Sequence, residues 1–436
     1  MVMNAKEYAR RRKQLARAMG PRSIAILPAA PIRYRNRDAE YLYRQDSDFY
    51  YLTGFPEPAA VAVIVPGRKQ GEYILFCRER DPHMETWHGR RAGQDGAREI
   101  YGADDSFPIS DIDDILPGLM EGKERVYYTM GRDAEFDQRV MGWVNRIRQQ
   151  IRGGAHAPGE FVSLEHLLHD MRLYKSRPEL AAMRQAARIS AAAHRRAMQA
   201  CRPGMTEYQI EAELLYEFRK AGAVPAYNSI VGGGANGCIL HYTENNAVLR
   251  DGDLLLIDAG AEYDYYAADI TRTFPVNGRF NPQQRAVYEV VLAAQEAAIA
   301  KVRPGNHWND PHQAAVRVLT EGLVELGLLK GKPKKLIQDE AYRQFYMHRT
   351  GHWLGMDVHD VGDYKIGGEW RVLEPGMVLT IEPGLYIAAD SKGVAKKWRN
   401  IGVRIEDDVL VTQDGCEVLT ADAPKAIDEI EALMQT

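Results

Sequence analysis

The sequence has few cysteines, no long apolar run and almost no excess of charge. Its four cysteines are scattered through 436 residues without a CxxC pair: Cys77, Cys201, Cys238 and Cys416. This spacing argues against a disulfide framework and is typical of a protein from a reducing compartment. Because no 18 consecutive residues are apolar, a membrane-spanning helix is not expected either. We therefore expect a cytoplasmic protein without a membrane partner.

The charge balance excludes two further classes of protein. Lys and Arg number 56 and Asp and Glu number 60, which leaves a net charge of −4. With 27% charged and 45% hydrophobic residues, the chain has enough apolar material for a core and is not expected to be disordered. It has no basic arm of the kind that binds nucleic acid. The basic run from Arg10 to Arg17 follows the acidic Glu7 and is interpreted as an amphipathic surface helix rather than a targeting peptide.

The pattern of predicted secondary structure changes near residue 173 and divides the chain into two predicted domains. The first part alternates polar connections with short β-rich runs at 23–27, 59–66 and 73–77. After it, a long helical stretch opens with a capping box whose two ends are Ser176 and Glu179. We predict an α/β domain at 1–173 and a larger domain at 174–436.

The second domain contains two copies of one helix-helix-strand plan. The helical runs 178–200 and 282–302 are each followed by Arg-Pro-Gly and a second helix. The strands that come next, within 249–260 and 373–384, share Leu, Gly, Leu, Ile and Gly at five of 12 positions. A duplicated unit buries its apolar faces against its copy about a pseudo-twofold axis. We therefore predict an α+β domain with one continuous sheet and the helices outside.

Acidic residues end the apolar strands of both copies. In the first copy Asp258 ends a strand, and a second strand over 265–274 is expected to return Asp269 beside it, as in a hairpin. In the second copy Glu382 occupies the position equivalent to Asp258, and Glu406 follows later. Neighbouring carboxylates repel one another unless a cation lies between them. The pattern therefore indicates a cation site where the two copies meet.

A histidine completes this set of ligands. His352 begins a segment that extends to His359 and is predicted to be a strand. Four carboxylates and one imidazole suit Mn, Co, Zn or Fe, and they suffice to bridge two ions roughly 3.5–4 Å apart. Any one of the acids alone is more simply a surface carboxylate. Together, at apolar strand ends where an unpaired charge is costly, they favour a dinuclear metal centre.

Two other motifs suggest different chemistry but lack the required context. Gly232 to Gly237 matches the GxGxxG fingerprint, with Asp253 beyond it, but a strand and a turn are expected where a dinucleotide site needs a long helix. His348 and His352 are four residues apart, as in a zinc-binding HExxH helix, but Arg349 stands in place of the catalytic Glu. We expect neither a Rossmann site nor a mononuclear zinc peptidase.

Several blocks of the sequence closely resemble the dinuclear metallopeptidases of the pita-bread fold. They are 257–263 with 268–273, His352 with His359-Asp360, 380–386, and Arg404-Ile405-Glu406. The branch that the chain resembles is the Xaa-Pro aminopeptidases (aminopeptidase P), because 48–56 and 85–91 in the first domain also resemble that branch. The resemblance implies a C-terminal pita-bread domain preceded by a smaller creatinase-type α/β domain.

The resemblance also implies a role for each residue of the predicted site. The metal ligands would be Asp258 on one ion, His352 and Glu382 on the other, and Asp269 and Glu406 bridging both. An outer ring would position the substrate or stabilise the oxyanion, and its members are His241, His348, His359 and Arg404.

Two aromatic residues complete the implied site. Tyr386 and Trp87 would bind substrate, and the tryptophan of similar bacterial enzymes reaches the active site of a neighbouring subunit in a tetramer. A homo-oligomer, a tetramer or a dimer, is therefore expected. The alternative for Trp87 is a half-buried core aromatic.

The implied activity is hydrolysis, by a metal-bridging hydroxide, of the bond between an N-terminal residue and a penultimate proline. The nitrogen of that bond carries no N–H, so the peptide has to be oriented through its carbonyl oxygens and the residues beyond, which His and Arg donors can hold. Glu382 is the candidate proton shuttle, and His241 and His359 would stabilise the oxyanion. The resemblance implies Mn²⁺, although Co²⁺, Zn²⁺ or Fe²⁺ also fits these ligands.

Three alternatives remain open at this stage. A prolidase restricted to dipeptides would use the same ligands. A methionine aminopeptidase fits less well because of the large N-terminal domain. A non-catalytic binding module of the same fold would be expected to lack some of the five ligands, which this sequence retains.

Overall fold

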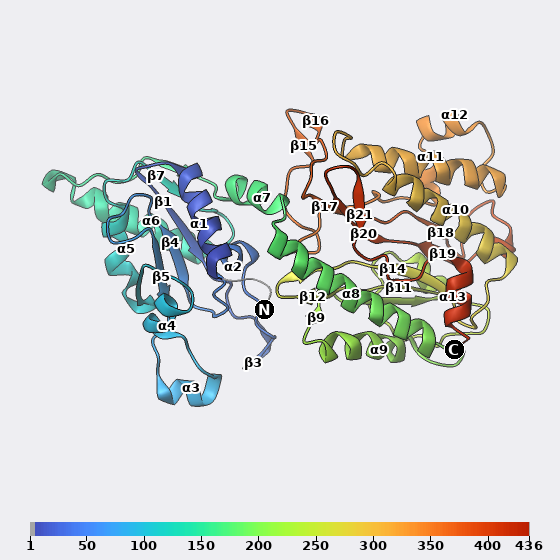
Figure 1. Ribbon diagram of the computed structural model, residues 1–436, viewed down its shortest axis with the longest axis horizontal. Helices are drawn as coiled ribbons and strands as arrows, with labels where there is room; N and C mark the ends of the chain where they lie inside the picture. The colour runs from blue at the N-terminus through green and yellow to red at the C-terminus, as the bar shows by residue number, and fades with distance from the viewer. Residues whose placement is uncertain (1–4, 436) are drawn as a thin grey trace. The chain divides into compact units, whose positions relative to one another are not determined.

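The computed structural model describes residues 5–435, which form two compact units (Figure 1). The N-terminal unit ends at Met171 and the C-terminal unit begins at Arg172. Each unit has a buried core of its own.

A six-stranded mixed sheet forms the centre of the N-terminal unit. Its strands lie in the order β6-β5-β4-β1-β7-β8, and their bounds are β1 Ser23–Pro28, β4 Val61–Ile64, β5 Tyr73–Cys77, β6 Asp105–Pro108, β7 Arg125–Tyr127 and β8 Glu160–Val162. Every residue of β4 and β5 is buried, as their nearly continuous apolar sequence requires. Helices α5 (Ile112–Met120) and α6 (Ala134–Gln149) pack on one face through Leu116, Val140 and Val144. The three predicted strands are present, the second shorter than expected.

Helix α7 (Glu165–Leu173) extends across the end of the N-terminal unit, and four other helices of the described residues precede α5. Their bounds are α1 Ala5–Met19, α2 Ser47–Thr53, α3 Pro82–His88 and α4 Gly93–Glu99. Helix α1 buries Tyr8, Leu15 and Met19 while Arg10 stays exposed. The predicted amphipathic helix at the start of the chain is therefore confirmed. Helix α3 has no buried residue.

Two helix pairs frame the C-terminal unit, one in each copy of the predicted plan. The first pair is α8 (Arg177–Ala200) and α9 (Glu207–Lys220), and the second is α10 (Pro282–Ile299) and α11 (Asn309–Glu325). Helix α8 begins with the predicted capping box, in which the backbone N–H of Ser176 donates to Glu179 Oε2 (2.8 Å). Within each pair the helices pack against one another.

The strands of the C-terminal unit form several small sheets instead of the single continuous sheet that we predicted. The first half contains the antiparallel sheets β10-β11-β14 and β13-β12-β9, and the second half contains β17-β20-β21 and the pair β18-β19. Their bounds are β9 Val224–Pro225, β10 Ile230–Gly233, β11 Leu254–Asp258, β12 Ala261–Tyr263, β13 Tyr266–Ala267, β14 Thr271–Pro275, β17 Val378–Ile381, β18 Gly384–Ile387, β19 Ile401–Arg404, β20 Asp407–Val411 and β21 Cys416–Val418. The prediction of one continuous sheet was wrong because each long β segment is interrupted.

The interruptions occur at the four carboxylates. Asp258 ends β11, Asp269 lies between β13 and β14, Glu382 lies between β17 and β18, and Glu406 lies between β19 and β20. Gly260 follows the first break at a very close backbone approach, since a Cβ there would lie 1.7 Å from the oxygen of Ala268. At such a position only glycine fits. The duplicated strand pattern thus places its four acids at the end of a strand or between two strands.

Three local predictions were wrong. The expected strand over 265–274 is divided into β13 and β14 by the irregular residues 268–270, and Tyr265 lies in the turn before β13 with a positive φ of 69°. The segment from His352 to His359 is not a strand; its only β contact is an isolated bridge from Trp353 to Leu379. The strand expected at 238–242, after the glycines, is absent, because a short 3-10 helix, Gly234–Cys238, is followed there by a turn. This is still not the long helix of a dinucleotide site.

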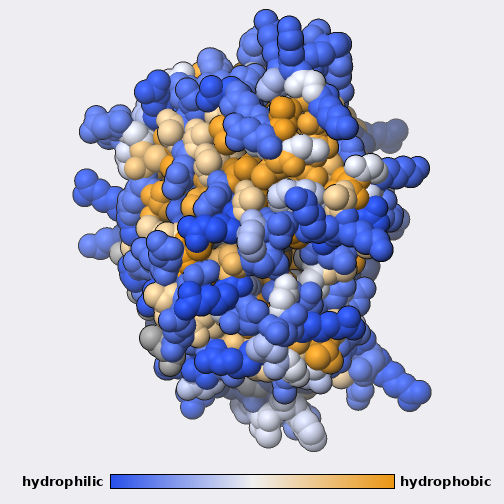
Figure 2. Space-filling view, turned by 90° about the vertical axis from the view of Figure 1, so that its right-hand side faces the viewer, coloured by the Kyte–Doolittle hydropathy of each residue, from blue (hydrophilic) through white to orange (hydrophobic). Residues whose placement is uncertain are grey.

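The face of the C-terminal unit drawn in Figure 2 is mainly hydrophilic. Apolar side chains gather in the upper half of this view, below a hydrophilic top. Leu326 and Leu328, which follow α11, and Ile337 in α12 (Pro333–Gln338) are partly buried and pack against the core. Of the helices in residues 5–435, none is both long and apolar enough to cross a bilayer.

Candidate metal centre

A cavity of about 460 Å³ in the C-terminal unit brings the predicted site residues together. The five predicted ligands lie on its wall: Asp258, Asp269, His352, Glu382 and Glu406. The four residues of the predicted outer ring line the same cavity: His241, His348, His359 and Arg404. These nine residues come from segments that are up to 165 positions apart in the chain, counted from His241 to Glu406 (406 − 241).

Three of the predicted ligands already form a compact group. One ligand atom each from Asp269, His352 and Glu406 lies within 4.8 Å of the others. His352 Nε2 is 3.4 Å from Asp269 Oδ2 and 3.7 Å from Glu382 Oε1. His352 Nδ1 lies 2.9 Å from the carbonyl oxygen of Trp353, a contact that places a proton on Nδ1. In the neutral ring, Nε2 is then left with its lone pair facing the carboxylates, as a metal-binding histidine requires.

The charges of this group also fit a cation. Burial and the nearby carboxylates raise the pKa of Glu406 well above its ordinary value, and burial raises the pKa of Glu382 to about 7. Burial and the charge of Asp269 raise the pKa of Asp258. Several carboxylates buried close together disfavour one another's ionised forms. A divalent ion between them supplies positive charge and so stabilises the ionised forms. The donor set therefore fits the metal ions that the sequence predicts.

Asp269 differs from the other three acids, because its pKa is lowered and not raised, and its partner in this is His352. Burial opposes ionisation of Asp269, but the hydrogen bond and the charge of His352 hold the pKa of Asp269 below its ordinary value. Burial likewise opposes the imidazolium, yet Asp269 and Glu382 raise the pKa of His352 to about 9. A metal ion on Nε2 would take the place of this proton.

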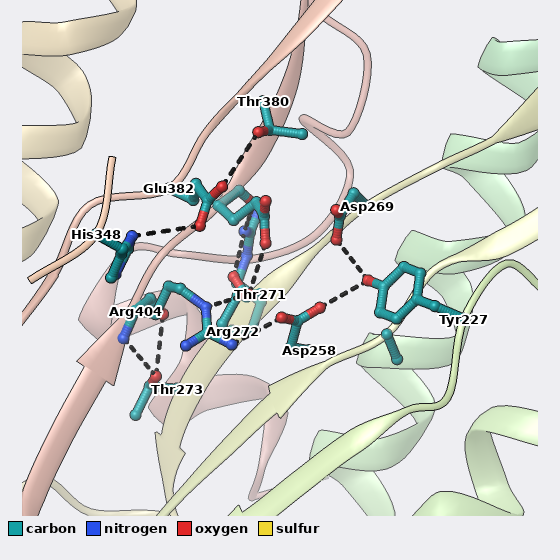
Figure 3. Close-up of polar contacts among 12 residues, drawn as sticks. Tyr227, Asp258, Asp269, Thr271, Arg272, Thr273, His348, Thr380, Glu382 and Arg404 are labelled. Atoms are coloured by element: carbon teal, nitrogen blue, oxygen red, sulfur yellow. Dashed lines mark hydrogen bonds and ion pairs between the residues drawn. The ribbon is translucent and has the colours of Figure 1, made fainter. Parts of the chain in front are cut away.

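Tyr227 is a residue of the site that the sequence did not reveal. Its hydroxyl lies 2.6 Å from Asp258 Oδ1 and 2.5 Å from Asp269 Oδ1, so it links the two acids of the first half (Figure 3). Burial and the two acids raise the pKa of Tyr227 well above its ordinary value, so the phenol stays protonated and donates. Tyr227 lies 31 positions before Asp258 in a segment without regular structure, and no local pattern marks it.

Two threonine hydroxyls and one further acid contact the predicted ligands and help to fix their positions. Thr271 Oγ1 donates to Glu406 Oε2 (2.6 Å), and Thr380 Oγ1 lies 3.4 Å from Glu382 Oε1. The carboxylate of Asp408 accepts from the backbone N–H of Asp269 (3.1 Å). Both threonines belong to the sequence blocks that carry the resemblance, which was the only signal that could have singled them out.

Arg404 lies inside the ligand cluster and contacts both halves of the site. Its Nη2 donates to Asp258 Oδ2 (2.7 Å) and its Nε to Thr271 Oγ1 (3.0 Å), as Figure 3 shows. Its Nη1 donates to the hydroxyl of Tyr386 (3.0 Å). Although burial opposes the charge, the surrounding oxygens raise the pKa of Arg404 well above its ordinary value. Arg404 is therefore a permanent cation beside Asp258.

Tyr386 lies behind the cavity wall. It is only 3% exposed, it is absent from the residues that line the cavity within the described chain, and its hydroxyl is 2.8 Å from His348 Nε2. This geometry favours a role in holding His348 and Arg404 over direct contact with a substrate.

Two histidines of the outer ring are neutral. Burial and Arg404 lower the pKa of His348 to about 3, and burial and the nearby His352 lower the pKa of His359. A neutral imidazole offers one donor and one acceptor, which suits binding of carbonyl oxygens.

Trp87 belongs to the N-terminal unit. It lies near the end of α3 and is 74% exposed. The alternative of a half-buried core aromatic is therefore wrong.

Comparison with known proteins identifies both parts of the chain. A model described as metallopeptidase family M24 matches residues 181–413, and a model described as aminopeptidase P, N-terminal domain, matches residues 8–127. The chain belongs to metallopeptidase family M24. The predicted fold class, a pita-bread domain preceded by a smaller N-terminal domain, is thereby confirmed.

Relatives match the chain over nearly its whole length. The Xaa-Pro aminopeptidase of Escherichia coli (strain K12) is 49% identical and covers 99% of this chain and 98% of its own. The structure of Pseudomonas aeruginosa aminopeptidase PepP covers 100% of this chain and 99% of its own, with a TM-score of 0.99 and 66% identity. A zinc-substituted E. coli aminopeptidase P in complex with product covers 99% and 98%, with a TM-score of 0.97 and 48% identity.

Proposed function

We infer that the chain is an Xaa-Pro aminopeptidase, a metal-dependent hydrolase that removes the N-terminal residue preceding a proline in a peptide. The observation that carries this inference is the convergence of four buried carboxylates and His352 on one cavity, in a chain that matches Xaa-Pro aminopeptidases from end to end. The relatives favour this activity over that of a prolidase. The aminopeptidase P N-terminal domain disfavours a methionine aminopeptidase, and the complete ligand set disfavours a non-catalytic module.

The proposed centre holds two divalent ions. Asp258 is assigned to one ion, His352 and Glu382 to the other, and Asp269 and Glu406 to both. The duplicated strand ends and the short distances among Asp269, His352 and Glu406 support this assignment. When bound, such ions activate a water molecule near neutral pH and polarise the carbonyl of the scissile bond.

The protein's own groups supply proton transfer and orientation. Glu382 carries the proton from the attacking water toward the proline nitrogen, because its carboxylate faces the cavity beside His352 and His348. His241 and His359 donate to the oxygen that becomes negative in the transition state. His348 and Arg404 bind the proline side of the peptide, since its tertiary amide has no N–H to offer.

A panel of peptides, assayed after metal removal and re-addition, tests this function. We expect an Xaa-Pro-Xaa tripeptide to lose at least about 100-fold in turnover after chelation and to regain it with Mn²⁺, which we propose as the native ion. Co²⁺, Zn²⁺ and Fe²⁺ serve as comparisons, and an Xaa-Ala-Xaa peptide is the substrate control. Faster cleavage of an Xaa-Pro dipeptide would favour a prolidase, and no recovery with any ion would favour a binding module.

We propose that the protein is a cytoplasmic homotetramer in which Trp87 walls the active site of a neighbouring subunit. Its 74% exposure on a helix without buried residues supports this role, because exposed aromatics are frequent anchors at interfaces. Trp87→Ala should then lower kcat/KM about 10-fold without lowering the melting temperature. Tyr208→Ala, which removes another exposed aromatic, is the control. A fully active monomer in light scattering would contradict the shared site.

A further inference from the structure

The segment 351–362 carries two residues of the site without forming a helix or a strand. The rings of His352 and His359 meet edge to face, with centroids 4.4 Å apart. The first part of the segment is attached to β17, because the N–H of Thr380 donates to the carbonyl of His352 (2.9 Å). The second part turns back on the first through the N–H of Asp360, which donates to the carbonyl of Trp353 (2.9 Å). The position of His359 therefore depends on what holds this turn.

The side chain of Asp360 lies between two cations from the start of the C-terminal unit. Arg172 Nη2 donates to Asp360 Oδ1 (2.5 Å), and Lys175 Nζ donates to Asp360 Oδ2 (2.9 Å). The same Arg172 nitrogen donates to Asp357 Oδ2 (2.7 Å). Two acids of the segment are thus tied to one pair of basic residues about 185 positions earlier in the chain.

Three members of this ionic cluster are shielded from water, whereas Asp357 at its edge is 39% exposed. The side chains of Arg172, Lys175 and Asp360 are 3%, 1% and 1% exposed. Although burial opposes ionisation, the charges of Lys175 and Arg172 hold the pKa of Asp360 below its ordinary value. Gly355 packs directly against the carboxylate, because a Cβ there would lie 2.1 Å from Asp360 Oδ2. A buried carboxylate with two cation partners has little freedom to move.

We propose that Asp360, fixed by Arg172 and Lys175, is a positioning residue that holds His359 and His352 in the geometry required for catalysis. Arg172, Lys175 and Asp360 are not among the residues that line the cavity, so they act through the histidines and not on the substrate. His359, which does line the cavity, is the residue directly before Asp360. The inference rests on the proposed roles of His352 and His359.

The test compares variants that differ in charge but little in size. Asp360→Asn removes the charge while keeping the shape, and Lys175→Met removes one cation while leaving Arg172 on Asp360. The double variant Asp360→Asn with Lys175→Met removes one charge of each sign, so it leaves no additional unpaired charge if the single variants fold poorly. Leu323→Ala, which opens a cavity in the core of the same unit, is the control for loss of stability alone.

For Asp360→Asn and for the double variant we expect kcat on an Xaa-Pro-Xaa peptide to fall about 10- to 100-fold, with weaker metal binding. KM should change by less than about 3-fold, because the groups that contact the substrate remain. Lys175→Met should lose less, and Leu323→Ala should lower the melting temperature without changing kcat at 25 °C. Unchanged kcat and metal affinity in a folded Asp360→Asn or double variant would overturn the proposal.

His359→Ala separates this inference from the proposed function. If His359→Ala loses turnover and Asp360→Asn does not, the assignment of the site stands and the positioning role fails. If His359→Ala keeps full turnover, the role of His359 in the proposed mechanism is wrong.

Discussion

Replacement of Glu382 by Ala should lower turnover of an Xaa-Pro-Xaa peptide by at least about 10³-fold, because one side chain is assigned two tasks. Glu382 lies at the break between β17 and β18, 3.7 Å from His352 Nε2 and 3.7 Å from His348 Nδ1. Its loss would remove a metal ligand and the proton carrier together. Steady-state kinetics with saturating metal measure the loss.

Glu382→Gln distinguishes the two tasks of this residue. The amide keeps one oxygen for a metal ion but cannot carry a proton. Metal content measured on the purified variants should therefore fall more in Glu382→Ala than in Glu382→Gln, while both lose turnover. Glu340→Ala, at an exposed surface glutamate, is the control for the substitution itself. Near-normal turnover by either Glu382 variant would contradict the proposed centre.

Arg272→Met should destabilise the protein by about 3–5 kcal/mol, which is the usual result of removing one partner of a buried ion pair. Arg272 and Asp407 are both fully buried, and Arg272 Nη2 lies 2.7 Å from Asp407 Oδ1. Arg272 Nη1 also donates to the carbonyl of Glu406 (2.6 Å), so it supports the backbone at a proposed bridging ligand. Urea unfolding followed by circular dichroism measures the change in the free energy of unfolding.

The matched control for Arg272 is an exposed ion pair of the same unit. Arg184 and Glu417 are 37% and 41% exposed and lie 2.6 Å apart, so Arg184→Met should cost less than about 1 kcal/mol. A second comparison, Arg272→Met with Asp407→Leu, removes both buried charges and should recover part of the lost stability. Equal, small effects of Arg272→Met and Arg184→Met would mean that the buried pair contributes little.

The duplication could be predicted because its signals are local. Capping boxes, Arg-Pro-Gly helix ends and runs such as Leu254 to Asp258 depend on neighbours along the chain, and the structure has α8, β11 and β17 within those runs. The same repeat led to the prediction that Asp258 and Glu382 lie at equivalent strand ends. Because a buried strand that ends in an acid needs a partner for the charge, a cation site followed from the sequence.

The breaks in the sheets could not be predicted in the same way. Asp269 was expected inside a hairpin strand, and His352 at the start of a strand. Asp269 instead lies between β13 and β14, and His352 in an irregular segment. Contacts with distant residues hold the backbone at these points, as between Asp408 and the N–H of Asp269 and between Thr380 and His352. No pattern of neighbouring residues records such contacts.

The sequence by itself therefore determined the two-part organisation, the repeated strand ends and the chemical type of the ligands, since each depends on residues close together in the chain. Tertiary structure decided which groups surround those ligands. Three contacts join residues that are 31 to 188 positions apart in the chain. They are the hydrogen bond of Tyr227 with Asp258, that of Arg404 with Asp258, and that of Arg172 with Asp360. Such contacts exist only when the fold brings the segments together, because their energy comes from burial and charge pairing in space.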